Sequence, residues 1–221
     1  MIISTNWLKK FVDIDTKIED LEILIGARLV EVESVDYIGD KYKDVLIVKV
    51  ISCENVEGSD HLHLTKIDDG GKCQVVERDE NGFVQVVCGA PNIAAGQLVA
   101  WLPPESIVPE TYNDSEPFKL GVRNLRGKVS NGMIASGKEL AISDDHEGIL
   151  VINENVAAGT SFAEHFELDD YLLNIENKSL THRPDCFGII GFAREIAAIS
   201  GKQFMTPDWL FKDTSDLGLN D

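Results

Sequence analysis

The sequence predicts an α+β fold in which a small β-barrel occupies the middle of the chain, over residues 40–152. Two observations support this prediction. Residues 1–39 and 153–200 carry apolar residues at helical spacing. The middle of the chain instead has short β-branched runs separated by Gly, Pro and Asn-Gly turn signals. With 221 residues, 43% of them hydrophobic, the chain is long enough for one large domain or two modest ones.

The first 39 residues predict two short helices and then a strand. Ser4 or Thr5 can cap the first helix, because a side-chain hydroxyl accepts a hydrogen bond from a free backbone N–H of the first turn. Thr16 and Glu19 form a capping-box pattern before the second helix. Residues 29–38 then alternate between apolar and acidic side chains, which is typical of a half-buried strand.

The middle segment contains six short apolar runs that predict strands: 44–53, 62–67, 73–77, 83–88, 97–102 and 148–152. Asn81-Gly82, between the third and fourth runs, is a strong hairpin signal. We expect these strands to form an OB-fold barrel, which tolerates long loops and binds oligonucleotides on one face. A β-sandwich of similar length fits the same pattern.

Residues 153–200 return to mixed structure, with a strand expected at 172–175. Arg183-Pro184-Asp185 predicts a helix entry, because proline is favoured in the first turn and an acidic residue is stabilised at the positive end of a helix. The tail at residues 212–221 is polar, and residues 201–221 are expected to be a linker toward a further domain that this chain lacks. The chain is therefore expected to be a fragment.

Charge is distributed unevenly along the chain. There are 20 Lys+Arg against 38 Asp+Glu, a formal net charge of −18, yet no acidic residue lies between Glu116 and Glu139. This stretch carries five basic residues: Lys119, Arg123, Arg126, Lys128 and Lys138. Clustered cations attract a polyanion such as RNA. A solvated strand edge, where lysines discourage pairing between sheets, is the alternative interpretation.

Several classes of protein and site are disfavoured by the sequence. We expect no membrane partner, because no window of about 18 apolar residues exists. The four cysteines form no Cys-x-x-Cys pair, which is typical of reduced thiols and indicates a cytoplasmic protein. His61 and His63 have no further ligand at suitable spacing, so no metal site is expected. No phosphate-binding glycine loop is present.

Three segments resemble motifs of known families. Residues 87–92 (Val-Cys-Gly-Ala-Pro-Asn) and 125–133, which end in Ser-Asn-Gly-Met, resemble the tRNA-binding OB domain of the endothelial-monocyte-activating polypeptide group. Residues 181–186, with Arg-Pro-Asp at their centre, resemble a motif of the bacterial phenylalanyl-tRNA synthetase β subunit. The start of the chain, Asn6-Trp7-Leu8, also resembles that subunit.

The resemblance implies an N-terminal, non-catalytic part of that β subunit. In this family, an OB domain (here 40–152) is inserted into a small discontinuous α/β domain (here 1–39 plus 153–200). The parent enzyme is an α₂β₂ tetramer that uses ATP and magnesium to attach phenylalanine to its tRNA. The implied partners are therefore tRNA and the α subunit. No cofactor and no catalytic residue is expected in this chain.

The resemblance and the charge pattern together give seven candidate RNA-binding residues. Ser130 and Met133 match the Ser-x-Gly-Met motif: a hydroxyl can bond a phosphate or a 2′-OH, and a methionine can pack on a base. The basic candidates are Lys119, Arg123, Arg126 and Lys128, and Asn92 completes the set. If residues 122–128 form one strand, Arg126 and Lys128 share a face.

Each candidate also has a structural interpretation. Residues 130–132 can be a turn, Met133 a core residue and Asn92 a turn residue. Two other functions stay open as well. The chain can be a stand-alone tRNA-binding OB protein, or a purely structural module for subunit assembly. The acidic balance of residues 40–151, 11 Lys+Arg against 18 Asp+Glu and hence −7, favours the structural module.

Overall fold

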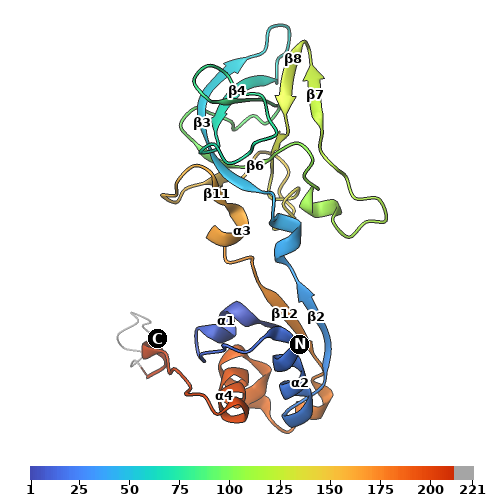
Figure 1. Ribbon diagram of the computed structural model, residues 1–221, viewed down its shortest axis with the longest axis vertical. Helices are drawn as coiled ribbons and strands as arrows, with labels where there is room; N and C mark the ends of the chain where they lie inside the picture. Colours follow the sequence, from blue (N-terminus) through green and yellow to red (C-terminus); the bar gives the residue numbers. More distant parts are fainter. Residues whose placement is uncertain (212–221) are drawn as a thin grey trace, which may run out of the picture. The chain divides into compact units, whose positions relative to one another are not determined.

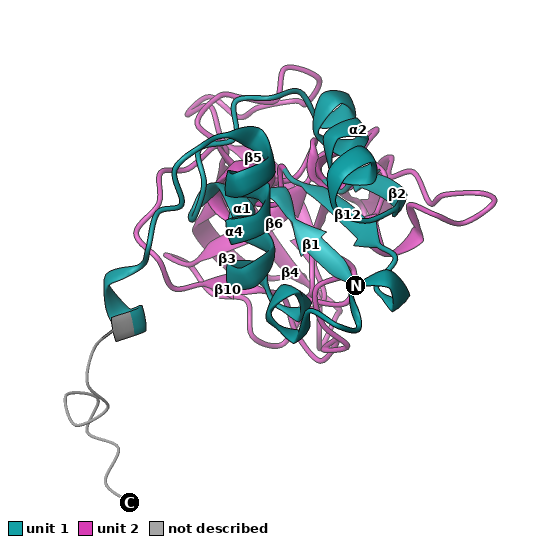
Figure 2. Ribbon diagram, turned by 90° about the horizontal axis from the view of Figure 1, so that it is seen from below, with its two compact units in different colours: residues 1–38, 170–221 teal, residues 39–169 magenta. Residues whose placement is uncertain are grey.

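The structure, a computed structural model, describes residues 1–211 and divides into two compact units. Unit 1 combines residues 1–38 with the chain from residue 170 onward, and unit 2 is the continuous segment 39–169. Figure 1 follows the chain by colour, and Figure 2 colours the two units separately. Of the expected linker 201–221, residues 212–221 lie outside the described part of the chain.

Unit 1 is built on a three-stranded antiparallel sheet with the order β1-β12-β2. Its strands are β1 (Ile2–Ser4), β2 (Val32–Tyr37) and β12 (Tyr171–Ile175), and its helices are α1 (Thr5–Lys9), α2 (Ile18–Arg28) and α4 (Ile189–Ser200). Three 3₁₀ turns complete it: η3 (Lys178–Leu180), η4 (Pro184–Phe187) and η5 (Asp208–Phe211). The central strand comes from the second chain segment and both edges come from the first, so neither segment forms this sheet alone.

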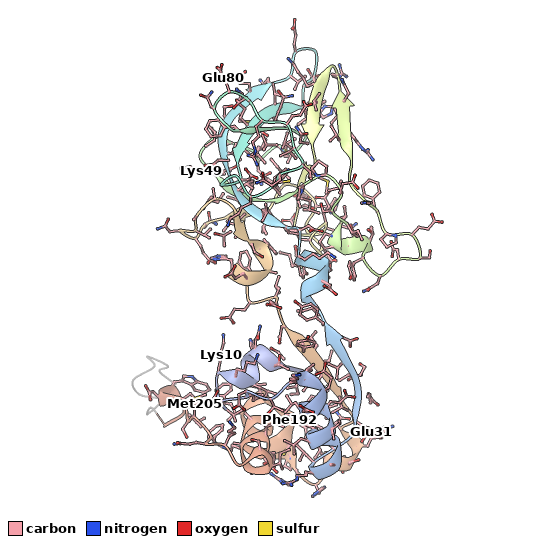
Figure 3. The ribbon with its side chains drawn as sticks, viewed as in Figure 1. Lys10, Glu31, Lys49, Glu80, Phe192 and Met205 are labelled. Atoms are coloured by element: carbon pink, nitrogen blue, oxygen red, sulfur yellow. The ribbon has the colours of Figure 1, made fainter. Side chains whose placement is uncertain are left out.

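The core of unit 1 lies between this sheet and the three helices. Leu8, Ile25, Leu173 and Phe192 are fully buried there, one from each of α1, α2, β12 and α4. Figure 3 labels Phe192 on α4. The expected helix entry at 183–185 is a 3₁₀ turn, η4, and the helix proper follows as α4. Gly201 ends α4 with φ 68°, a left-handed conformation that glycine adopts without steric cost.

Unit 2 contains a seven-stranded antiparallel sheet and a separate hairpin. The sheet strands are β3 (Leu46–Asn55), β4 (His63–Asp68), β5 (Val84–Cys88), β6 (Leu98–Leu102), β9 (Met133–Ile134), β10 (Val151–Ile152) and β11 (Thr160–Ser161), and the hairpin strands are β7 (Val122–Leu125) and β8 (Lys128–Asn131). The helical elements are α3 (Phe162–His165), η1 (Gly39–Tyr42) and η2 (Pro109–Thr111). The main path runs β10-β6-β3-β4-β5, with β9 paired to β6 and β11 to β3.

Strand β3 organises unit 2, since it pairs with β4, β6 and β11. Ile47, Val48 and Val50 are fully buried, with Ile47 in one hydrophobic cluster and Val48 and Val50 in another, so both faces of β3 are covered. Trp101 of β6 is also fully buried, and its indole Nε1 donates a hydrogen bond to the Asn131 carbonyl at 2.9 Å. A buried indole N–H needs such a partner, because an unpaired buried donor costs free energy. The fold is thus mixed α and β with few helices and mostly antiparallel sheets, which agrees with the predicted class at that level.

Two details differ from the sequence prediction. Residues 73–77 form a loop and not a strand. The Arg78 guanidinium donates to the Asp69 carboxylate and to the Cys73 carbonyl, and these bonds hold the loop. The expected boundary near residue 153 lies instead at 169/170. Residues 153–169 group with unit 2 because β11 pairs with β3 and Phe162 packs in its core.

Candidate nucleic-acid interface

The basic stretch forms the antiparallel hairpin β7–β8, in which Leu125 pairs with Lys128. Arg126 and Gly127 make the two-residue turn, with φ of 51° and 78°. Two consecutive positive φ values suit the right-handed twist of the flanking strands. The premise that 122–128 is one strand is therefore wrong. Paired residues share a face in an antiparallel ladder, so Arg123, Leu125 and Lys128 lie on one face of the hairpin.

The four basic candidates differ in whether their charged groups already interact with other residues of unit 2. Lys119 Nζ lies 2.6 Å from a carboxylate oxygen of Glu105, with both side chains largely exposed. Arg126 Nη1 donates to the carbonyl of Gly58 at 2.5 Å. The guanidinium of Arg123 lies 5.5 Å from the centre of the Phe118 ring, and neither Arg123 nor Lys128 makes an ion pair within residues 1–211.

Ser130 is part of the scaffold. It is 4% exposed, and its hydroxyl accepts from the backbone N–H of Val87 at 3.0 Å and donates to the carbonyl of Gly132 at 3.2 Å. Asn131 is 3% exposed and donates from Nδ2 to the carbonyl of Gln85 at 3.0 Å. These bonds connect β8 to β5 through side chains. Ser130 therefore has a structural role, but as part of strand β8 and not of the turn expected at residues 130–132.

Asn92 is held by a facing loop. Its amide donates to the carbonyl of Ile149 at 3.0 Å and accepts from the N–H of the same residue at 2.9 Å. A Cβ added at Gly148 would come within 2.5 Å of the Asn92 amide oxygen, so the two segments approach closely. Although Asn92 is exposed, both polar atoms of its side chain already have partners.

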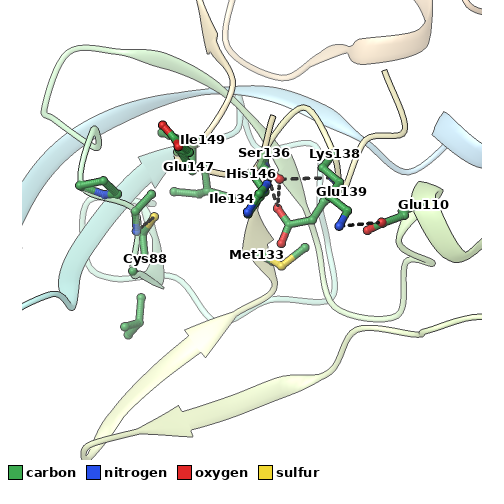
Figure 4. A pocket seen from close by; sticks show the side chains of 15 residues that line it. Cys88, Glu110, Met133, Ile134, Ser136, Lys138, Glu139, His146, Glu147 and Ile149 are labelled. Atoms are coloured by element: carbon green, nitrogen blue, oxygen red, sulfur yellow. Dashed lines mark hydrogen bonds and ion pairs between the residues drawn. The ribbon is translucent and has the colours of Figure 1, made fainter. Parts of the chain in front are cut away.

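Met133 lines a pocket of about 480 Å³ that sequence reasoning did not identify. The pocket is formed by three stretches of unit 2, residues 87–91, 133–139 and 146–149, together with Glu110 (Figure 4). Its acidic and basic side chains are Glu110, Lys138, Glu139, His146 and Glu147. Two of the segments that resemble family motifs, 87–92 and 125–133, meet at this pocket, and that shared resemblance was the signal available in the sequence.

Hydrogen bonds fix part of the pocket wall. One carboxylate oxygen of Glu139 accepts from the Ser136 N–H at 2.7 Å and from its hydroxyl at 2.8 Å, and Lys138 Nζ lies 3.7 Å from a carboxylate oxygen of Glu110 (Figure 4). Cys88 is buried in the same wall, and burial raises the pKa of its thiol. A buried neutral thiol is a poor nucleophile, because the thiolate is the reactive form.

One cluster in unit 1 has the residue types of a metal site. Ligand atoms of Asp185, Cys186 and Glu195 all lie within 4.8 Å of one another. Arg183 occupies this cluster, donating to Asp185 at 3.0 and 2.8 Å and to Glu195 at 2.5 Å. Burial raises the pKa of the Cys186 thiol, which disfavours the thiolate that a metal or a nucleophilic reaction requires. The cluster therefore fixes the entry to α4.

Within residues 1–211, no helix is both long and apolar enough to span a lipid bilayer.

Comparison with known proteins gives consistent results. Residues 45–161 match the protein family described as "Putative tRNA binding domain". The chain is also similar to proteins named "Phenylalanine--tRNA ligase beta subunit". The protein from Neisseria meningitidis serogroup B is 34% identical over 209 residues, which is 94% of this chain and 24% of the relative. The proteins from Oceanobacillus iheyensis and Salinibacter ruber are 33% and 34% identical, over 98% and 94% of this chain and 26% and 25% of each relative.

The chain thus spans about a quarter of the length of the curated relatives it matches. The family match, by contrast, covers more than half of this chain and contains β3 to β10 together with the pocket and the basic hairpin. On that match, the chain belongs to the family described as "Putative tRNA binding domain".

Proposed function

We propose that this chain is a non-catalytic part of the β subunit of a phenylalanine–tRNA ligase, in which unit 2 makes an auxiliary contact with tRNA. The observation that carries the proposal is the exposed hairpin β7–β8. It holds three cations, Arg123, Arg126 and Lys128, within a chain of net charge −18. A polyanion is repelled by most of such a surface and attracted to that hairpin.

Arg123 and Lys128 are the primary phosphate contacts in this proposal. Both are exposed, both lie on one face of the hairpin, and neither cation has an ion pair in the described chain. Lys119 and Arg126 contribute less, because Glu105 and the Gly58 carbonyl already engage them. With so few contacts, binding is weak and depends strongly on salt, since each neutralised phosphate releases counterions.

We also propose that unit 2 is an OB-type barrel. Its strands follow the order β6-β3-β4-β5, and β8 approaches β5 through the bonds of Ser130 and Asn131 already described. A third bond, from Gln85 Nε2 to the Val129 carbonyl at 2.8 Å, supports the same approach. These contacts would close the barrel and leave the hairpin projecting from one side, where a nucleic acid can reach it.

The remaining features belong to the parent enzyme. We propose a cytoplasmic α₂β₂ synthetase in which the α subunit is the partner. ATP and magnesium would serve amino-acid activation outside this chain. The support is the similarity to proteins named as the β subunit of this ligase, of which this chain spans about a quarter.

A structural role is the second candidate. Ser130, Asn92 and Arg126 make hydrogen bonds within unit 2 and Lys119 pairs with Glu105, so four of the seven candidate residues already have partners there. In that case unit 2 would support subunit assembly without touching RNA.

The two candidates are separated by measuring tRNA binding to the full chain at low and at physiological salt, with a double-stranded RNA as control. We expect selective binding that weakens with salt. The double variant Arg123→Ala/Lys128→Ala should bind more weakly, and its salt slope should fall by about 0.7–0.9 for each lost contact. The matched control Lys9→Ala/Lys17→Ala removes two exposed lysines of unit 1 and should leave both quantities unchanged. Equal binding by the hairpin variant and the wild type would refute a tRNA contact through the hairpin, and no binding by either would favour the structural role.

A further inference from the structure

We propose that the pocket between β5 and β9 receives one unstacked nucleobase of the bound RNA, and that the carboxylates of Glu139 and Glu147 accept hydrogen bonds from the edge of that base. This inference rests on the proposed tRNA contact and specifies its chemistry. Figure 4 shows the two sides of the pocket and labels both carboxylate residues.

The size and floor of the pocket suit a flat apolar face. Its volume of about 480 Å³ lies in the range of about 300–1,000 Å³ that is typical of small-ligand sites. Val87, Ile134 and Ile149 line it and are at most 7% exposed, so they form a fixed apolar surface. Met133, which is partly buried, adds a polarisable thioether that can lie against an aromatic ring. Proteins that recognise single-stranded RNA hold unstacked bases on such surfaces.

The charge of the pocket distinguishes a base from a phosphate. The lining holds three carboxylates, Glu110, Glu139 and Glu147, against two basic side chains, His146 and Lys138, of which Lys138 lies 3.7 Å from Glu110. The surplus is negative and would repel a phosphate, but carboxylates accept hydrogen bonds from the N–H groups of a base edge. One oxygen of Glu139 is taken by Ser136, whereas its other oxygen and the Glu147 carboxylate have no hydrogen-bond donor within residues 1–211.

The pocket is connected directly to the basic hairpin. Ser130, on β8, binds the backbone of Val87 in the pocket wall, and Met133 follows β8 after a single glycine, Gly132. A nucleotide strand that lays its phosphates along the hairpin would therefore reach the pocket at the end of β8. This arrangement separates the two interactions, with cations for the backbone of the RNA and carboxylates for one base.

The donor pattern predicts which bases are preferred. Guanine presents an imino N–H and an amino group on one edge, hypoxanthine lacks the amino group, and uracil presents a single imino N–H. We expect the full chain to bind a single-stranded oligouridylate with one central guanosine roughly tenfold more tightly than the all-uridine strand, and a central inosine to bind like uridine because it lacks the second donor.

The direction in which Glu147→Gln changes tRNA affinity tests the pocket. The Glu147 side chain is exposed, so the variant should fold. If the carboxylate accepts from a base, Glu147→Gln loses most of the guanosine preference and weakens tRNA binding several-fold, with the salt slope unchanged. If the pocket does not contact RNA, removing a negative charge leaves tRNA binding unchanged or tightens it. The matched control Glu77→Gln removes an exposed carboxylate outside the pocket and should leave the guanosine preference intact.

The outcomes also separate this inference from the proposed function. Salt-dependent tRNA binding with no guanosine preference, or with tighter binding by Glu147→Gln, overturns the base pocket and leaves the hairpin contact standing. Absence of any tRNA binding by the wild-type chain overturns both.

Discussion

Removing the guanidinium of Arg78 should destabilise unit 2 strongly, and the loss should depend on pH. Arg78 donates to both carboxylate oxygens of Asp69, at 2.6 and 2.9 Å, and to the carbonyls of Cys73 and Gly82 at 2.5 and 3.0 Å. The Asp69 side chain is fully buried. In Arg78→Met that carboxylate would keep only the backbone N–H groups of Cys73 and Gly71, at 2.8 and 3.2 Å.

The size of the effect follows from leaving a buried charge without its partner. Such a loss costs about 3–5 kcal/mol. At about 2–4 °C per kcal/mol, the Tm should fall by roughly 10 °C. Lys66→Met is the matched control: Lys66 lies 2.6 Å from Asp79, but both side chains are partly exposed, so its loss should cost at most about 1 kcal/mol.

The pH dependence follows from the carboxylate. Burial is the largest single influence on the pKa of Asp69 and raises it, but the bonds and charge of Arg78 together with the backbone N–H bonds of Cys73 and Gly71 outweigh burial, so the pKa is lowered overall. In the wild type this stabilisation is present above the unfolded pKa of about 3.9 and is lost as pH falls through the lower folded pKa. In Arg78→Met only burial and the two amide bonds remain, so the folded pKa should rise above the unfolded one.

Chemical unfolding of both proteins between pH 7 and pH 4 measures this difference. The destabilisation should be largest at pH 7 and should shrink as pH falls, because protonation removes the buried charge of the variant. A destabilisation below about 1 kcal/mol at pH 7, or one that stays constant down to pH 4, would refute the reasoning.

Three further predictions concern glycine geometry and polar contacts. Gly132→Ala should cost more than about 2 kcal/mol of unfolding free energy, because φ is 77° and the new Cβ would lie 2.0 Å from the Leu102 carbonyl oxygen. The control Gly127→Ala, at φ 78° but in open space, should cost only about 1 kcal/mol. Equal losses in thermal unfolding would contradict this. Asn92→Ala should cost about 1–3 kcal/mol in urea unfolding, because it removes two hydrogen bonds to the facing loop. Its tRNA affinity, measured at urea concentrations below the unfolding transition, should stay unchanged. A loss of affinity without a loss of stability would assign Asn92 to the RNA contact. Asp170→Ala should destabilise unit 1 by about 2–4 kcal/mol, because the buried Asp170 carboxylate accepts three hydrogen bonds at 2.6–2.9 Å from Ser4, Thr5 and Asn6. An unchanged thermal melt by far-ultraviolet circular dichroism would disprove that role.

The elements of unit 1 could be predicted where a local pattern specifies them. The alternation at 29–38 gives β2, and the Ser4 hydroxyl caps α1 as the sequence indicates. The boundary at 169/170 could not be predicted in the same way. Strand β11 has only two residues, Thr160 and Ser161, which show no apolar alternation, and it is defined by pairing with β3 far away in the sequence.

The candidate site was predictable in composition but not in geometry. The basic residues can be read from the sequence, whereas the bonds that engage Ser130 and Arg126 depend on Val87 and Gly58, which are distant in the chain. The turn at Arg126-Gly127 was missed because arginine is not a typical residue for a positive φ. The pocket is lined by three segments that are separate in the sequence, and no local sequence pattern predicts that they lie together.

The two-segment construction of unit 1 sets an order for its formation during protein synthesis. The N-terminal amino group of Met1 bonds to the carbonyl of Ile175, 174 residues later, and β12 is the central strand of the sheet. At about 5–20 residues per second, β1 and β2 would leave the ribosome on the order of ten seconds before the strand that pairs with both of them. Unit 2 is continuous and emerges within that interval, so its folding can begin first. Ile38 and Asp170 are hydrogen-bonded at 3.0 Å, so the chain leaves unit 1 and returns to it at one place. A nascent chain with a folded unit 2 would therefore have a much shorter effective loop to close when β12 arrives.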